Sequence, residues 1–210
     1  MKWLIAAAVA IGVGAWIGRR SMEAADSIDD MPDQSPDLIE SIATDLNPMN
    51  YIEPDVSQGT AAANIKAFLD MIAYAEGTSG TDGYRTLFGG GLFDSYADHP
   101  RRVFTFTNRI GQTLRTTAAG RYQFLARTWD GLKAKLALSD FGPANQDAAA
   151  IELIRERGAL NDVKAGRFVT AVNKCAPVWA SLPGAGYNQP ERKLSTLVSV
   201  YTAAGGNLEA

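Results

Sequence analysis

Glu76 is the residue of this chain whose type and position best suit catalysis. The residues before it place apolar side chains at the spacing of one helix face, namely Ile65, Phe68, Leu69 and Ile72. Gly77 follows, and glycine commonly adopts the left-handed conformation at which helices end. The pattern predicts a helix over about 62–76 with Glu76 on its last turn.

A carboxyl group in that position favours its protonated form. The C-terminus of a helix carries negative partial charge, and apolar neighbours disfavour ionisation, so both effects raise the pKa of Glu76. A carboxyl group that is protonated at neutral pH is a suitable general acid for cleaving a glycosidic bond. The alternative is an ordinary Glu on a solvated helix turn, which its position alone does not exclude.

Five motifs along the chain support the catalytic interpretation. They are 68–71 (FLDM) leading into 75–78 (AEGT), 98–101 (DHPR), 119–123 (AGRYQ), 156–160 (ERGAL) and 179–187 (WASLPGAGY). In order and spacing these motifs resemble the lambda-type bacteriophage endolysins, which are peptidoglycan lytic transglycosylases. The resemblance extends over about 65–206. It implies a mostly helical, lysozyme-like domain that cuts the MurNAc–GlcNAc bond and leaves a 1,6-anhydro-muramic end, with Glu76 as the catalytic residue.

The resemblance also indicates residues that bind the glycan strand. Gln123 and Tyr122 lie in a segment that looks like the family's second motif, and the Gln amide offers both a donor and an acceptor to an N-acetyl group. Tyr187 matches the third motif, where a phenol can approach the acid or stack on a sugar face. Tyr84 is a further stacking candidate, and Asp98 is a polar candidate in the DHPR segment.

The number of catalytic carboxyl groups separates two reaction types. Hydrolysing glycosidases use two. A transglycosylase can use one, which protonates the leaving oxygen and then accepts a proton from the sugar's own C6 hydroxyl as that oxygen closes onto C1. The residues leave the choice open, because Asp82, Asp94 and Asp98 are each a candidate second carboxylate as well as a turn former. A hydrolysing muramidase is therefore an alternative, as is a virion or membrane component that mainly binds the wall.

Residues 3–18 form an uncharged run flanked by Lys2 and by Arg19 and Arg20. We expect 1–20 to be a membrane anchor or uncleaved signal, with the domain facing the periplasm from the host inner membrane or attached to the virion. Half of the sixteen residues are Ala or Gly, and a full span needs about 20 apolar residues. A releasable anchor, as in signal-arrest-release endolysins, is therefore also open. A cleaved signal peptide fits less well, because residues 23–25 (EAA) make a poor cleavage site.

Residues 21–61 have the composition of an extended linker. Residues 21–65 contain ten acidic residues, no basic residue, and four of the nine prolines. Such a segment self-repels and has too little apolar content to fold alone. We expect it to act as a spacer between the anchor and the domain.

Residues 62–210 are predicted to form one domain. Residues 66–210 carry seventeen Lys and Arg against thirteen Asp and Glu, a net charge of +4, which suits an anionic wall polymer but is too small to indicate nucleic acid. The single Cys175 and the single His99 disfavour a disulfide framework and a Cys/His metal site. We therefore expect no metal or cofactor, and a loop-capping role for His99.

The fold class predicted for this domain is α+β, a helical body with a small β flap. Residues 102–107 have strand composition, and Gly111 provides a turn before 112–114. Thr116 and Thr117 are predicted to begin a helix whose apolar face carries Tyr122, Leu125, Trp129, Leu132 and Leu136. Further helices are expected over 145–156, 167–174 and 191–204, with Trp129 and Trp179 in the core.

Overall fold

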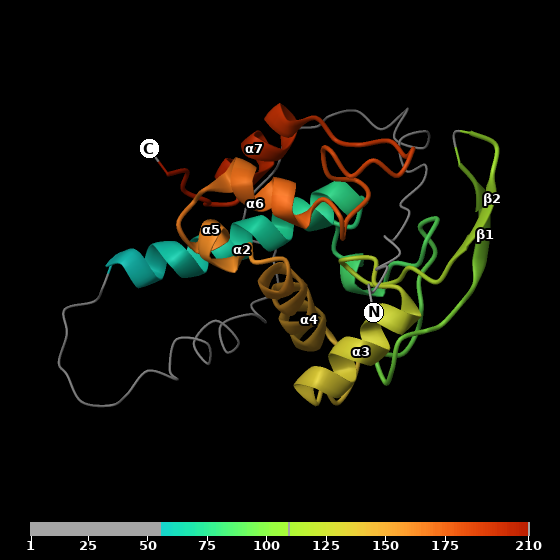
Figure 1. Ribbon diagram of the computed structural model, residues 1–210. Coiled ribbons are helices and arrows are strands. Elements are labelled where there is room, and N and C mark those ends of the chain that lie inside the picture. The colour runs from blue at the N-terminus through green and yellow to red at the C-terminus, as the bar shows by residue number, and fades with distance from the viewer. Residues whose placement is uncertain (1–55, 109, 210) are drawn as a thin grey trace.

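The computed structural model describes residues 56–108 and 110–209. A helical body surrounds α2, and a β-hairpin extends from one side of it (Figure 1). In chain order the elements are α2 (Val56–Glu76), a 3-10 turn (Gly83–Arg85), β1 (Phe104–Thr107), β2 (Thr113–Thr116), α3 (Ala126–Leu136), α4 (Pro143–Glu156), α5 (Leu160–Lys164), α6 (Phe168–Cys175) and α7 (Leu194–Ala203).

The central helix of the body is α2, which packs against α4, α5 and α7. It begins six residues before the predicted start, and Phe68, Met71 and Ile72 are completely buried because helices cover it on several sides. Its end agrees with the prediction. Gly77 has φ of 75°, and the Thr78 amide donates to the Ala73 carbonyl at 2.8 Å, which closes the last turn.

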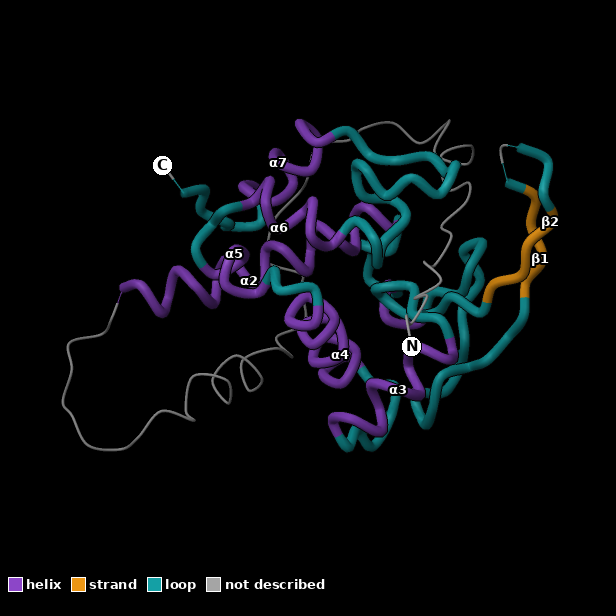
Figure 2. Tube along the Cα trace, viewed as in Figure 1, coloured by secondary structure: helices purple, strands orange, loops and turns teal. Residues whose placement is uncertain are grey.

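The predicted β flap is the hairpin of β1 and β2, which run side by side away from the helices in Figure 2. Their antiparallel register pairs Phe104 with Thr116 and Thr107 with Thr113. The connecting turn contains Gly111 at φ of 80°, as expected from its sequence. Phe88 packs against β1, with its ring centroid 5.9 Å from that of Phe104 and 5.4 Å from that of Phe106.

The helix predicted to follow Thr117 is shorter than expected. Residues 119–124 form a tight turn instead, with positive φ at Gly120 and Gln123, and α3 begins only at Ala126. A side chain at Gly120 would meet Oε1 of Gln146 at 2.3 Å, so the close packing of this turn requires glycine. The N-cap of α3 is Leu125 and not Thr117 as predicted, although the Thr117 hydroxyl accepts the Ala126 amide at 2.9 Å.

The later helices agree with the predicted pattern, and one short helix was missed. Gly158, at φ of 65°, follows the end of α4 as expected. The missed helix is α5, whose five residues are too few to display a helical periodicity. Trp129 and Trp179 are buried in the core, as predicted.

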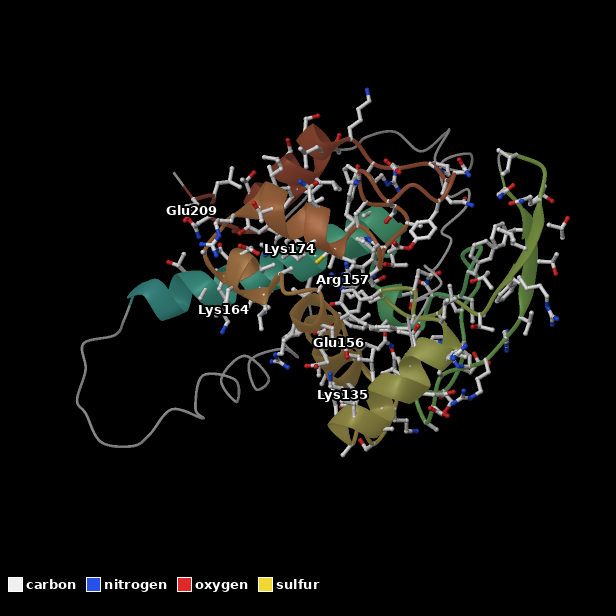
Figure 3. The ribbon with its side chains drawn as sticks, viewed as in Figure 1. Lys135, Glu156, Arg157, Lys164, Lys174 and Glu209 are labelled. Carbon is white, nitrogen blue, oxygen red and sulfur yellow. The ribbon has the colours of Figure 1, made fainter. Side chains whose placement is uncertain are left out.

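Ion pairs tie neighbouring helices together on the face drawn in Figure 3. The labelled Lys135 on α3 and Glu156 on α4 lie beside each other, with Nζ and Oε1 2.8 Å apart. Lys174 on α6 binds Asp162 on α5 at 2.6 Å. In these pairs a carboxylate neutralises each lysine charge. Solvent-exposed ion pairs contribute less than about 1 kcal/mol each to the free energy of unfolding.

The predicted anchor at 1–20 and most of the predicted linker at 21–61 lie outside the described residues. Within 56–108 and 110–209, no helix combines the length and apolar content that crossing a membrane requires.

Candidate active site

Glu76 is the last residue of α2, and its side chain is almost completely buried, with 3% of the residue exposed. Oε1 accepts a hydrogen bond from the Ser181 hydroxyl at 2.6 Å. Oε2 is buried and has no hydrogen-bond partner among the residues that the structure describes. One carboxyl oxygen is therefore held by the protein, and the other is left without a protein partner.

Burial determines the protonation state of Glu76. Desolvation raises the pKa of this carboxyl group, and the Ser181 hydrogen bond and the positive charge of Arg192 lower it by less, so that the pKa rises from 4.5 to about 8. Glu76 is therefore predominantly protonated at neutral pH, as its position at the end of an apolar helix predicted.

The segment from Ser181 to Arg192 folds back onto the end of α2. The Arg192 amide donates to the Ser181 carbonyl at 2.8 Å, and its Nε donates to the Ala75 carbonyl at 3.2 Å. Its guanidinium also lies over the ring of Tyr74, 5.4 Å from the ring centroid, which is a cation–π contact. Sequence reasoning missed the roles of Ser181 and Arg192, although Ser181 lies in the 179–187 motif.

A second set of contacts fixes the chain just beyond Glu76. The Thr78 hydroxyl lies between the carbonyl oxygens of Ala73 and Arg121. The Arg121 side chain donates to Oδ1 of Asp70 on α2 at 2.6 Å and forms an ion pair with it. Arg121 thus joins α2, the residues after its end, and the 119–124 turn.

Gln123 and Tyr122 have different surroundings within this turn. Gln123 is 3% exposed, and its Nε2 donates to the carbonyls of Gly120 at 3.0 Å and Thr86 at 3.2 Å. Tyr122 is 1% exposed, and its hydroxyl donates to Asp147 at 2.6 Å. The Tyr122 ring therefore presents no open face to a sugar in this structure, and its contacts are those of a core residue.

Tyr84 lies next to Tyr122 and shares its partner. Its hydroxyl donates to Oδ1 of Asp147 at 2.9 Å, and the Arg121 guanidinium lies 5.1 Å from the centroid of its ring. Burial, and then the charge of Asp147, raise the pKa of Tyr84 well above its usual range. One face of this half-buried ring is thus covered by Arg121, and the hydroxyl is engaged with the core.

Asp98 and His99 organise a loop next to α3. Asp98 accepts hydrogen bonds from Arg101 at 2.9 Å, Trp129 at 3.0 Å and Lys133 at 3.1 Å. His99 is buried, with Nδ1 accepting the Arg101 amide at 3.1 Å and Nε2 bonded to the Phe124 carbonyl at 2.9 Å. The expected loop-capping role of His99 is confirmed, and Asp98 is occupied by three side chains of the protein.

Tyr187 lies on a glycine-rich loop that is closed by Glu191, whose carboxylate accepts the amides of Gly184 at 2.9 Å and Gly186 at 3.0 Å. The Tyr187 hydroxyl donates to the Pro177 carbonyl at 2.9 Å, and the side chain remains partly exposed. On the same loop Gln189 is buried with no partner in the described chain for either amide atom. No cluster of metal-ligating side chains occurs within 56–108 and 110–209.

Comparison with known proteins shows the family. A family model described as "Endolysin" matches residues 66–208. The endolysin of Escherichia phage lambda is 45% identical over 149 residues, covering 68% of this chain and 92% of that protein. The endolysin of Escherichia phage P2 is 47% identical over 156 residues, covering 68% and 93%.

Solved structures of the bacteriophage lambda lysozyme have the same fold. One, in complex with a chitohexasaccharide, matches with a TM-score of 0.65 and 41% identity, covering 77% of this chain and 100% of the other. A second lambda lysozyme structure matches over the same shares with a TM-score of 0.62. The chain therefore belongs to the phage endolysin family of lysozyme-like enzymes that degrade the bacterial cell wall.

Proposed function

We propose that this endolysin is a peptidoglycan lytic transglycosylase that cleaves the MurNAc–GlcNAc β-1,4 bond and forms 1,6-anhydro-MurNAc. The observation that carries the proposal is Glu76, a buried carboxyl group whose pKa is raised to about 8 and one of whose oxygens has no partner within 56–108 and 110–209. A neutral carboxyl group of this kind can give a proton and take one back at neutral pH.

In the proposed reaction Glu76 makes both proton transfers. As an acid it protonates the glycosidic oxygen while the bond from that oxygen to C1 of MurNAc breaks. As a carboxylate it then accepts the proton of the C6 hydroxyl of the same sugar, and O6 bonds to C1. The products are an anhydro end and a free GlcNAc hydroxyl, Glu76 is protonated again, and no water is consumed.

The surroundings of the other carboxylates favour this reaction over hydrolysis. A hydrolase places its two carboxyl groups about 5–5.5 Å or 6.5–9.5 Å apart. Burial raises the pKa of Glu76, and the groups of the described chain that lower it are Ser181 and Arg192, neither of which is a carboxylate. Of the three candidates in the sequence, Asp98 is occupied by Arg101, Trp129 and Lys133. The Asp94 side chain is 92% exposed and faces Arg85, and Asp82 is exposed at the start of the 3-10 turn.

The glycan strand is the proposed substrate. The lambda lysozyme structure that matches this chain holds a chitohexasaccharide, and we infer that this chain also binds a glycan. Gln123 is proposed to receive an acetamido group through Oε1, because its Nε2 already binds two backbone carbonyls. Tyr187 is proposed to contact a sugar with its partly exposed ring.

Mass spectrometry of digested peptidoglycan tests the reaction. We expect anhydro-muropeptides from the native protein and no products from Glu76→Gln, which keeps the side chain's size but cannot donate the acid proton. Reducing MurNAc ends, heavier by one water, would make the protein a hydrolysing muramidase. Wall binding without any product would make it a binding component.

We also propose that residues 1–20 keep the enzyme at the host inner membrane with its domain on the periplasmic side. The support is the uncharged run at 3–18 with basic residues at both ends. Fractionation of expressing cells before and after addition of an uncoupler, with the mass of the protein, tests this proposal. Release on depolarisation indicates a weak anchor, and retention indicates a permanent anchor or a virion protein. A shortened N-terminus or a full-length cytosolic protein would contradict it.

A further inference from the structure

We propose that Ser181 is a positioning residue that holds Oε1 of Glu76 and thereby leaves the transferable proton on Oε2. This inference rests on the proposed role of Glu76 as the acid and base. It goes further by assigning the two oxygens of one carboxyl group to different tasks.

The hydrogen-bond inventory of Ser181 gives the direction of the contact. Its Oγ lies 2.6 Å from Oε1 of Glu76, and both residues are 3% exposed. Within the described chain, Oε1 is the one acceptor within hydrogen-bond distance of this hydroxyl. In the proposed complex with the glycan, a proton on Oε2 has the glycosidic oxygen as its acceptor, so donation by Ser181 to Oε1 gives both hydrogens an acceptor. Donation by Glu76 to Ser181 would leave the buried serine hydrogen without one, which is unfavourable. Ser181 is therefore the donor, and the proton of a neutral Glu76 resides on Oε2.

The backbone holds Ser181 in place relative to Glu76. Arg192 binds the Ser181 carbonyl with its amide and the Ala75 carbonyl, one residue before Glu76, with its Nε. The next residue, Leu182, is completely buried in the core. The serine and the glutamate are thus fixed to the same third residue, so the 2.6 Å contact does not depend on a mobile side chain alone.

The arrangement favours the carboxylate that forms during the reaction. When Oε2 gives its proton to the glycosidic oxygen, Glu76 becomes an anion, and a hydrogen bond to an anion is stronger than one to a neutral acid. Ser181 therefore stabilises the state after proton donation more than the state before it. In the second step Oε2 accepts the proton of the C6 hydroxyl while Oε1 stays bound to Ser181, so the same oxygen makes both proton transfers.

The test is to remove the donor and measure the titration of Glu76. Two variants remove or weaken the donor: Ser181→Ala, and Ser181→Cys, which keeps a similar volume but is a weak donor. We expect each to raise the titration midpoint of the Glu76 carboxyl group by about one pH unit above the native value. NMR titration of the labelled Glu76 carboxyl group in the full-length protein measures this midpoint directly. On soluble glycan strands we expect kcat to fall by about tenfold while KM changes by less than about twofold, because substrate contacts remain.

A matched control separates positioning from stability. Asn64 lies on α2, about 18 Å from Glu76 along the helix axis. Asn64→Ala removes its partly buried hydrogen bonds with the Lys164 carbonyl and the Asn207 amide. This variant should lose stability without changing the Glu76 midpoint or the pH dependence of kcat/KM. If both Ser181 variants also keep the native midpoint and pH dependence, Ser181 is only structural and the inference is wrong. That result leaves the proposed function intact, whereas cleavage by Glu76→Gln would remove the function itself.

Discussion

The end of α2 and the loop before α3 each hold one prominent carboxyl group, and the protein treats the two groups in opposite ways. Glu76 is buried and has one side-chain donor, Ser181, and its pKa is raised to about 8. Asp98 is partly exposed and has three side-chain donors. Its partial desolvation raises the pKa, but the bonds from Arg101, Trp129 and Lys133 outweigh this and hold the pKa well below its usual range.

The contrast shows that two quantities decide whether a carboxyl group is neutral or charged: how deeply it is buried and how many hydrogen-bond donors surround it. A buried carboxyl group with few donors remains neutral and can give a proton. A carboxylate with several charged partners organises the surrounding loop and side chains instead. Both groups belong to motifs of the sequence, and their surroundings assign them different roles.

The largest expected effect comes from removing the acid. Glu76→Gln should reduce wall cleavage by at least about a hundredfold, because the amide cannot donate or accept the required proton. Clearing of a suspension of bacterial walls measures the rate, and circular dichroism verifies that the fold is retained. Activity of the folded variant above a few per cent of the native value would contradict the role of Glu76.

The stability of the protein should report the raised pKa of Glu76. Below pH 4.5 the group is neutral in both the folded and unfolded states, and above this pH it ionises first in the unfolded chain. The unfolding free energy of the native protein should therefore fall by about 4 kcal/mol relative to that of Glu76→Gln as the pH rises from 4.5 to 8. Urea denaturation at several pH values measures the difference. Parallel pH profiles for the two proteins would mean that Glu76 is not buried as a neutral group.

Asp98→Asn should affect stability more than catalysis. We expect a loss of about 1 kcal/mol at pH 7, since solvent screens its ion pairs with Arg101 and Lys133. A depressed pKa stabilises the fold above the unfolded value of 3.8 and loses this effect in acid, so the difference from the native protein should shrink as the pH falls below 3.8. Wall cleavage should stay within about threefold of native. A loss of wall cleavage as large as that expected for Glu76→Gln would indicate that Asp98 is a second catalytic carboxylate.

The smallest effect is expected from removing residues 1–55, which deletes no residue of α2. The remaining domain should be soluble, cleave isolated walls at the native rate, and unfold within about 1 kcal/mol of the full chain, because an acidic linker buries little apolar surface. Removing 1–61 as well tests the boundary, since it deletes the first six residues of α2. An inactive or aggregated 56–210 protein would show that the preceding segment belongs to the fold.

Local features of this protein could be read from the sequence because each is encoded within a few neighbouring residues. The spacing of Ile65, Phe68 and Ile72 identified α2, and Gly77 marked its end, since helical periodicity and a left-handed glycine are short-range properties. The β-hairpin followed in the same way from strand composition on both sides of Gly111. The position of Glu76 on the last turn of an apolar helix was therefore determined before any tertiary contact was known.

Tertiary structure decided the conformation of one segment that helical periodicity predicts wrongly, and it decided the contacts between residues far apart in the chain. Residues 119–124 carry a helical apolar pattern, but the close approach of Gly120 to Gln146 bends them into a turn and buries Tyr122 against Asp147. The bond between Ser181 and Glu76 joins residues 105 positions apart, and Asp98 meets Trp129 and Lys133 only through folding. Hydrogen bonds and desolvation depend on which groups the fold brings together. The sequence therefore singled out Glu76 as the candidate acid, while the fold set its pKa and its hydrogen-bond partner.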